Sequence, residues 1–256
     1  MRLCRVAHAT FEQPRYAFIE GDDVCPVNER EWFDGLAMPR SAYSIPLAEV
    51  RLLAPVTPSK IVCVGRNYRE HAAELGNKMP EEPLLFLKAP SAVISDGDTI
   101  ELPRESGRVE HEGELGVVIG HRARHISANE DPLSYVLGYT CVNDVTARDL
   151  QRKDVQFTRA KSFDTFCPVG PVIVRAIDPL DAEVTTRLNG DIKQRARTST
   201  MAFSVPFLIR YIAEIMTLYP GDLIATGTPA GVSPMKHGDI VEIEIEGIGV
   251  LRNYVN

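Results

Sequence analysis

The chain has 256 residues, of which 44% are hydrophobic and 25% are charged, and its formal net charge is −7. This composition is typical of a globular protein with a sizeable core, and the acidic balance argues against a dedicated nucleic-acid binder. No apolar run approaches the roughly 18 residues of a membrane span, and the first residues lack the apolar stretch of a secretory signal. We therefore expect one or two domains, with no membrane and no nucleic acid as partner.

The cysteines are odd in number and form no C-x-x-C pair; they are Cys4, Cys25, Cys63, Cys141 and Cys167. Scattered cysteines of this kind are typical of reduced, mostly buried thiols, so we expect a cytoplasmic protein. A catalytic cysteine stays open as an alternative, although we see no histidine placed to activate one.

The N-terminal part of the chain is predicted to be rich in β-structure. Short β-type runs at Leu3–Val6 and Tyr16–Ile19 alternate with turn residues, and prolines are frequent between positions 46 and 58. We predict a small N-terminal subdomain over residues 1–55 and a larger domain over residues 58–256.

A short helix is predicted after the β-type run Lys60–Val64, with Asn67 as its N-cap and Gly76 as its stop. On this helix His71 and Glu74 are three residues apart and share one face. Because a carboxylate orients a histidine ring and stabilises its charged form, the pair is a candidate general base. The alternative is an exposed polar helix that happens to contain both residues.

The segment HEGELGVVIG carries the strongest chemical signal in the chain. Glu110, Glu112 and Glu114 occupy alternate positions, so a strand would point them to one face, and the apolar run Leu115–Ile119 is typical of a buried strand. Like charges on a half-buried strand repel each other, which predicts a cation against them, and a hard divalent ion prefers carboxylate oxygens. A solvated acidic strand edge is the alternative, because the glutamates at 242, 244 and 246 alternate in the same way.

A basic cluster follows the next strand-like run, Leu137–Asn143, which ends at Asp144. The segment after it is helix-compatible at its start and contains Arg148, Arg152, Lys153, Arg159 and Lys161. In an acidic chain this cluster is either a solvated basic face or a place where an anionic substrate is held near a metal.

The last part of the chain predicts a hairpin at Asn189-Gly190, a helix that begins near Ser204 with an apolar core-packing stripe, and further strands. The segment GTPAG at residues 227–231 lacks the Gly-Lys-Ser/Thr ending of a phosphate loop. It can still place the Thr228 hydroxyl and backbone N–H groups against a carboxylate.

Several separated motifs together resemble the fumarylacetoacetate hydrolase family in order and spacing, over about residues 58–256. They are GRNYREHAAE, FLKAPSAV, HEGELGVVIG, NDVTARDLQ, AKSFDTFCPVGPVIV, NG with TSTMAFSVPFLI, and TLYPGDLIATGTPAGV. Each motif alone is weak, but the set is specific. The resemblance implies a mainly β fold with few helices (α+β), built on a rolled β-sandwich core with a small N-terminal β-rich subdomain, and a homodimer.

The resemblance also implies a set of site residues. The positions that match the family's metal ligands are Glu112, Glu114 and Asp144, for Mg²⁺ or Mn²⁺, whereas Glu110 has no ligand counterpart. The positions that match its other site residues are His71, Glu74 and Lys161 for catalysis, and Arg148, Gln151 and Thr228 for substrate binding.

The short N-terminal segment and the single copy of the motif set resemble the compact bacterial branch of the family. Acylpyruvate hydrolases, hydroxyheptadienedioate isomerases and oxaloacetate decarboxylases share one site there. In such a site a metal polarises the oxygens of a small anionic 2-oxo or dicarboxylic acid and stabilises an enolate. We rank C–C bond hydrolysis of an acylpyruvate-type acid first, ketonisation of 2-hydroxyhepta-2,4-diene-1,7-dioate second, and oxaloacetate decarboxylation third.

Two other classes of protein stay open. An Fe(II) oxygenase would use His111 with nearby carboxylates, but such a site needs two histidines and one carboxylate on one face, and no second histidine is obvious. A non-enzymatic β-roll protein that binds a small molecule would have no turnover to lose on mutation.

Overall fold

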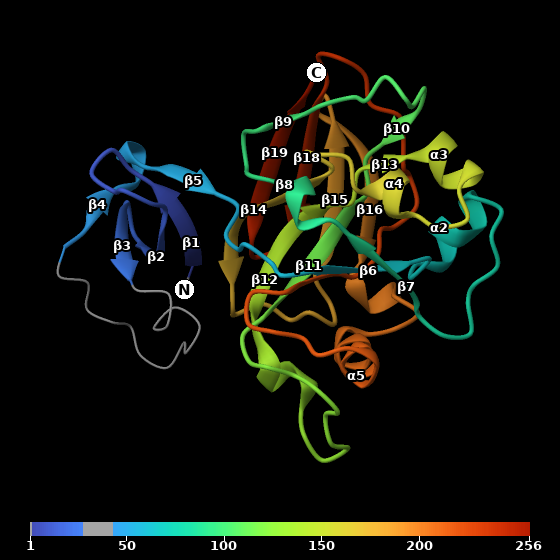
Figure 1. Cartoon of the computed structure of the whole chain (residues 1–256), viewed down its shortest axis with the longest axis horizontal. Helices are drawn as coiled ribbons and strands as arrows, with labels where there is room; N and C mark the ends of the chain where they lie inside the picture. Colours follow the sequence, from blue (N-terminus) through green and yellow to red (C-terminus); the bar gives the residue numbers. More distant parts are fainter. Residues whose placement is uncertain (1, 28–42) are drawn as a thin grey trace.

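The computed structural model describes residues 2–27 and 43–256, and β-strands dominate it (Figure 1). Its main sheet has twelve strands, and its path begins with the N-terminal strands and continues through strands of the motif-bearing part of the chain. In spatial order the path is β4 (Ile45–Pro46), β3 (Asp23–Val27), β2 (Arg15–Glu20), β1 (Arg2–Ala7), β14 (Cys167–Val174), β12 (Val136–Asn143), β11 (Gly113–Ile119), β17 (Leu223–Ala225), β6 (Ile61–Gly65) and β7 (Leu84–Lys88), with β5 (Arg51–Leu53) on β1 and β8 (Val93–Ile94) on β14. The predicted mainly β fold is confirmed.

A second sheet packs on the first and closes the core. Its order is β16 (Asp191–Arg197), β15 (Glu183–Leu188), β18 (Ile240–Ile245), β19 (Gly249–Val255) and β9 (Thr99–Ile100). The apolar residues Val241, Ile243 and Ile245 of β18 are buried, and β18 packs against β12 while β19 packs against β14. The alternation of apolar and acidic residues in this strand therefore arises because one face packs on the core and the other faces water.

The N-terminal strands β1 to β4 form an antiparallel meander, drawn in blue at the left of Figure 1. The strands predicted from sequence lie within β1 and β2. β1 also pairs with β14, through Arg2 with Val174 and Leu3 with Ile173, so this meander is hydrogen-bonded to the larger part of the chain. The boundary between residues 55 and 58 stays a prediction, and residues 28–42 of the predicted subdomain lie outside the described residues.

β11 and β12 lie at the centre of the main sheet, and every residue of β11 is buried. Their antiparallel register pairs Gly113 with Asn143, so the end of β12 meets the start of β11. The backbone N–H of Asp144 then donates to the Glu112 carbonyl at 2.8 Å. This register brings together acidic residues that are about thirty positions apart in the sequence.

The single acidic strand predicted over residues 110–119 is wrong in one respect. The chain breaks after β10 (Val109–Glu110), which pairs with β13 (Thr146–Ala147), and β11 begins only at Gly113. The break arises because Glu112 donates its N–H to the Asn143 side chain at 2.9 Å, which replaces a ladder hydrogen bond. Glu110 consequently lies in β10, Glu112 in the irregular segment between the two strands, and Glu114 in β11.

The helices of the described residues are α2 (Arg69–Glu74), α3 (Arg148–Lys153), α4 (Thr158–Lys161) and α5 (Val205–Ile215). Helix α2 ends before Gly76, which has a φ of 68°, as predicted. The predicted cap is wrong, because Tyr68 holds the N-cap position and no side chain caps it. The Asn67 side chain instead bonds to the backbone of Phe203 and Thr226, since these tertiary partners satisfy its amide fully.

The remaining local predictions agree with the structure in most respects. Asn189 and Gly190 have φ values of 54° and 86° and join β15 to β16, as expected of a tight hairpin. Helix α5 starts after Ser204, whose side chain makes no capping hydrogen bond. The helix buries Leu208, Ile209 and Ile212 of its predicted stripe, whereas Ile215 is exposed. The five cysteines are free, and Cys25 is the one that is not buried. Within residues 2–27 and 43–256, no helix is long and apolar enough to cross a membrane.

Candidate active site

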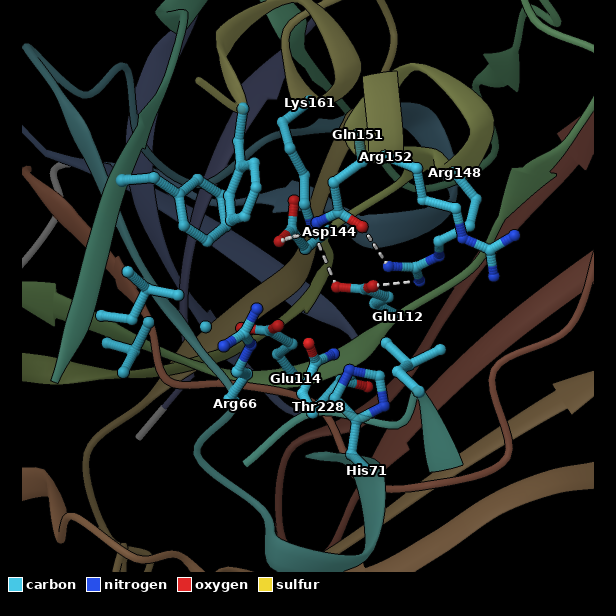
Figure 2. A pocket seen from close by; sticks show the side chains of 17 residues that line it. Arg66, His71, Glu112, Glu114, Asp144, Arg148, Gln151, Arg152, Lys161 and Thr228 are labelled. Atoms are coloured by element: carbon cyan, nitrogen blue, oxygen red, sulfur yellow. Dashed lines mark hydrogen bonds and ion pairs between the residues drawn. The ribbon is translucent and has the colours of Figure 1, made fainter. Parts of the chain in front are cut away.

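Residues of helices α2, α3 and α4 and of strands β6, β7 and β11 line a pocket of about 230 Å³ (Figure 2). Eight of the nine predicted site residues line it: His71, Glu112, Glu114, Asp144, Arg148, Gln151, Lys161 and Thr228. Glu74 does not line the pocket but lies next to His71. The pocket therefore collects residues from most of the motifs.

Three buried carboxylates, those of Glu112, Glu114 and Asp144, form the floor of this pocket. Each offers an oxygen, and these oxygens lie within 4.8 Å of one another. The β11–β12 register explains the cluster, because Glu112 and Glu114 flank the first residue of β11 and Asp144 follows the last residue of β12. An all-oxygen donor set of this kind suits a hard divalent cation.

Two of these carboxylates have cationic partners. The Lys161 ammonium lies 2.8 Å from Glu112 Oε2 and 2.6 Å from Asp144 Oδ2. Burial by itself would raise the pKa of Glu112, but Lys161 and Arg148 outweigh it and hold that pKa well below its usual range. For Lys161, burial opposes the charge, but Asp144 and Glu112 outweigh burial and raise the pKa of the ammonium. Glu112 and Lys161 are therefore both ionised at neutral pH.

Glu114 differs from its two neighbours, since no ion pair reaches it from any described residue. Its Oε2 accepts one hydrogen bond, from the Gly227 N–H at 2.7 Å. Burial, followed by the charges of Asp144 and Glu112, raises the pKa of Glu114 well above its usual range. A carboxylate in this position either keeps a proton or needs a positive charge beside it. The donor set therefore fits a divalent cation held by all three carboxylates.

Arg148 is bound by the protein on three sides. Its Nε donates to Glu110 at 2.6 Å, its Nη2 to Glu112 at 2.5 Å and its Nη1 to Gln151 Oε1 at 2.6 Å. Glu110, which has no predicted ligand role, thus anchors Arg148. The predicted grip of Arg148 on a substrate stays a prediction. Gln151 uses its oxygen on Arg148, which leaves its amide NH₂ as a donor in the pocket.

His71 is buried, and its ring faces the carboxylates across the pocket (Figure 2). Its Nδ1 lies 3.5 Å from Glu74 Oε2 and has no hydrogen-bond partner among the described residues. Burial lowers the pKa of His71, and Glu112 opposes this effect only in part. The ring is therefore neutral at neutral pH and can accept a proton. Both Glu74 oxygens accept from the Gly231 N–H at 3.1 Å, so Glu74 ties helix α2 to the 227–231 segment.

Gln194, on β16, is a site residue that the sequence did not reveal. Its side chain is buried, donates to the Thr228 hydroxyl at 2.7 Å, and accepts from the Gly113 N–H at 3.0 Å. The Thr228 hydroxyl in turn donates to the Gly113 carbonyl at 2.9 Å. Its proton is thus used within the protein, so the predicted contact between Thr228 and a substrate carboxylate stays untested. In the sequence KQR, Gln194 looks like part of a solvated hairpin arm.

His111 also belongs to this hydrogen-bond network. Its Nδ1 lies 3.1 Å from Gln194 Oε1 and its Nε2 lies 2.8 Å from Ser233 Oγ. Both ring nitrogens therefore have protein partners, and the carboxylate cluster found among the described residues contains no histidine. The donor set does not match the two histidines and one carboxylate of an Fe(II) oxygenase.

Lys88, the last residue of β7, is the second site residue missed from the sequence. Its ammonium is fully buried, 2.6 Å from Asp144 Oδ1 and 3.1 Å from the Val145 carbonyl. A lysine that ends an apolar strand is a usable signal, because buried ammonium groups are almost always paired. Lys88 and Lys161 hold the two Asp144 oxygens from different sides.

The tie between Glu74 and the 227–231 segment depends on a glycine. Gly231 has a φ of 104°, and a Cβ there would lie 1.9 Å from the Lys193 carbonyl oxygen. We expect Gly231→Ala to lower the free energy of unfolding by more than about 2 kcal/mol, measured by urea denaturation. Gly21→Ala is the matched control, because Gly21 has a φ of 60° with open space around it. Equal losses in the two variants would contradict the packing argument.

The fold and the pocket define a class of protein: a two-sheet β fold with a buried carboxylate cluster suited to a divalent cation. A family model described as fumarylacetoacetate (FAA) hydrolase C-terminal matches residues 60–256. A second model, described as Rv2993c-like, N-terminal, matches residues 1–55. The chain belongs to the fumarylacetoacetate hydrolase family.

Relatives within this family bear different reaction names. Oxaloacetate tautomerase YisK of Bacillus subtilis (strain 168) is 45% identical over 224 residues, which cover 82% of this chain and 74% of that protein. The structure of 2-hydroxyhepta-2,4-diene-1,7-dioate isomerase from Mycobacterium marinum matches with a TM-score of 0.89 and 45% identity, covering 100% of this chain and 98% of the other. Maleylpyruvate hydrolase from Sphingobium sp. SYK-6, in complex with manganese(II) ion and pyruvate, matches with a TM-score of 0.81 and 35% identity, covering 100% and 98%.

Proposed function

We propose that this protein is a divalent-cation-dependent enzyme that moves a proton on a small 2-oxo dicarboxylic acid and interconverts its keto and enol forms. One observation carries the proposal: a neutral histidine, whose Nδ1 has no hydrogen-bond partner among the described residues, shares a pocket with three buried carboxylates. The motifs alone rank C–C bond hydrolysis first. Relatives of 44–45% identity that are named tautomerases now favour proton transfer.

Glu112, Glu114 and Asp144 are the residues that would hold the cation, Mg²⁺ or Mn²⁺. When bound, it supplies the positive charge that attracts the carboxylate and keto oxygens of a 2-oxo acid and favours loss of a proton from the neighbouring carbon. The manganese and pyruvate in the name of the Sphingobium relative support this donor set and this ligand class.

Residues of the chain would transfer the proton, bind the substrate and stabilise the developing negative charge. His71 accepts a proton from the carbon next to the keto group and returns it, and Glu74, 3.5 Å away, orients the ring. The Gln151 amide donates to a substrate oxygen. Lys161 bridges Glu112 and Asp144, keeps Glu112 ionised, and places a positive charge where an enolate would develop. Glu112, Asp144 and Lys161 are buried, which strengthens the electrostatic interactions among them.

The pH dependence of the reaction follows from His71. Burial, with help from the charges of Arg148 and Lys161, lowers the pKa of His71 below its ordinary value of 6.5, while Glu112 and Glu74 oppose the shift. The neutral, basic form therefore dominates at pH 7, and acid removes it. We expect kcat/KM to be level near neutral pH and to fall with one proton at a midpoint below 6.5. A midpoint above that value would contradict the assignment, and pH–rate profiles measure it.

Hydrolysis of a C–C bond is the second candidate, because His71 with Glu74 could equally activate a water molecule. Two structural relatives bear hydrolase names, at 37% and 35% identity. A parallel assay with acetylpyruvate, fumarylpyruvate, oxaloacetate and a hydroxyheptadienedioate separates the candidates. Release of pyruvate from the first two indicates hydrolysis, CO₂ from oxaloacetate indicates decarboxylation, and isomerised acid without cleavage indicates the proposed proton transfer.

A further inference from the structure

The pocket contains two cationic side chains that the proposed chemistry does not use, those of Arg66 and Arg152. Its lining includes Arg66, Arg148, Arg152 and Lys161. Arg148 and Lys161 are bound by carboxylates of the protein. No hydrogen bond or ion pair joins the side chain of Arg66 or Arg152 to any residue in the part of the chain that is described. Figure 2 shows Arg66 on the side of Glu114 and Thr228, and Arg152 on the opposite side with Gln151.

The backbone holds Arg66 in a costly conformation. Arg66 has a φ of 58°, in the left-handed region that residues other than glycine rarely adopt. Its neighbour Asn67 is fully buried and makes side-chain hydrogen bonds to the Phe203 carbonyl, the Phe203 N–H and the Thr226 carbonyl. A Cβ on Gly227 would approach Asn67 Cβ to 2.7 Å, so the two segments are in close contact. The backbone that presents Arg66 is therefore fixed before any ligand arrives.

Strain of this kind persists where a side chain is needed in one place. Arg66 follows β6, whose last residue, Gly65, also lines the pocket with Val64 and Leu84. Arg66 itself is partly buried against this apolar wall, whereas Arg152 is exposed on α3. The Arg66 guanidinium therefore starts from a fixed backbone and has no partner among the described residues, so it can pair bidentately with a carboxylate that enters the pocket.

We propose that Arg66 is the specificity-determining residue that pairs with a second carboxylate of the substrate, at the end away from the 2-oxo group. The inference rests on the proposed function in taking a 2-oxo acid as the ligand of this pocket. Arg66 then explains a preference for dicarboxylic over monocarboxylic 2-oxo acids. It takes no part in proton transfer.

Binding measurements test this without turnover. Isothermal titration calorimetry in Mg²⁺ compares 2-oxoglutarate with 2-oxopentanoate, which carries a methyl group in place of the distal carboxylate. We expect the wild type to prefer the diacid, and Arg66→Gln to weaken the diacid at least about tenfold while leaving the monoacid within about twofold. Arg66→Lys should keep part of the preference, because it retains the charge but loses the bidentate geometry.

Two further variants separate recognition from charge and from stability. Arg152→Gln removes a charge from the same pocket and should leave the preference unchanged. Arg66→Gly removes the strained backbone and the guanidinium together, so its thermal unfolding temperature should equal or exceed that of the wild type while the preference is lost. A loss of the preference in Arg152→Gln rather than Arg66→Gln would overturn the inference.

Equal weakening of both acids in Arg66→Gln would also overturn it, because Arg66 would then bind the shared carboxylate. The inference would likewise be overturned if the wild type bound the diacid no more tightly than the monoacid. Kinetics supply an independent readout, in which the KM for oxaloacetate rises in Arg66→Gln by the factor seen in binding and kcat is retained. If the wild type turns over no 2-oxo acid, the proposed function fails, while an Arg66-dependent binding preference for the diacid would still stand.

Discussion

Replacing Glu114 with glutamine is expected to abolish divalent-cation binding by the purified protein. Glu114 is buried beside Asp144 and Glu112 and has no ionic partner among the described residues. It therefore contributes a negative charge that a bound cation would neutralise. Glutamine keeps the shape and can still accept from the Gly227 N–H. Calorimetry with Mg²⁺ and Mn²⁺ should show affinity at least about a hundredfold weaker than in the wild type.

The same variant has a second, opposite effect on stability. The pKa of Glu114 is raised, so ionised Glu114 destabilises the folded state at neutral pH, and this cost disappears as the pH falls and the carboxylate is protonated. In EDTA at pH 7, Glu114→Gln should therefore unfold at a higher temperature than the wild type. Added Mg²⁺ should stabilise only the wild type, by mass action.

Glu110→Gln is the matched control and should retain the cation, because Glu110 bonds to Arg108 and Arg148. Full metal affinity in Glu114→Gln would refute the ligand assignment.

Replacing His71 with glutamine is expected to lower kcat by a factor of about 10² to 10⁴ at saturating Mg²⁺, because it removes the base that moves the proton. The binding of Mg²⁺ and of 2-oxoglutarate should stay within a few-fold of the wild type, since His71 makes no hydrogen bond through Nδ1. The measurement is deuterium exchange at the carbon next to the keto group, followed by NMR.

Glu74→Gln provides the graded comparison for His71. Glu74 lies 3.5 Å from the ring and also accepts from Gly231, so it acts on ring orientation rather than on the proton itself. We expect a loss of about tenfold in kcat, with the low-pH limb of the rate profile retained. Wild-type exchange in His71→Gln would show that another group moves the proton.

Local sequence patterns predicted the parts of the fold that depend on neighbouring residues. The Asn189-Gly190 hairpin, the buried stripe of α5 and the stop at Gly76 follow from turn chemistry and helical periodicity. The cap of α2 did not, because Asn67 bonds to residues more than a hundred positions away. The preference of asparagine for helix N-caps is a local property. At Asn67, hydrogen bonds to distant residues outweigh that preference.

The candidate site likewise contains some residues that sequence patterns predicted and others that only tertiary contacts reveal. Alternating glutamates and the family motifs indicated Glu112, Glu114 and Asp144, and the β11–β12 register brings these carboxylates together. Gln194 was missed because it sits between exposed hairpin residues, and its role arises from contacts between distant strands that no local pattern displays. Lys88 was also missed, although its place at the end of an apolar strand is a usable signal.

The most direct test of the account follows oxaloacetate with this protein in Mg²⁺ and in EDTA. Enol oxaloacetate, monitored by ultraviolet absorbance, should convert to the keto form faster than in buffer with Mg²⁺ alone. EDTA should stop the acceleration, and excess Mg²⁺ should restore it. Pyruvate should form far more slowly than the enol disappears. A rate equal to that of Mg²⁺ in buffer, or the formation of pyruvate at the rate at which the enol disappears, would contradict the proposed proton transfer.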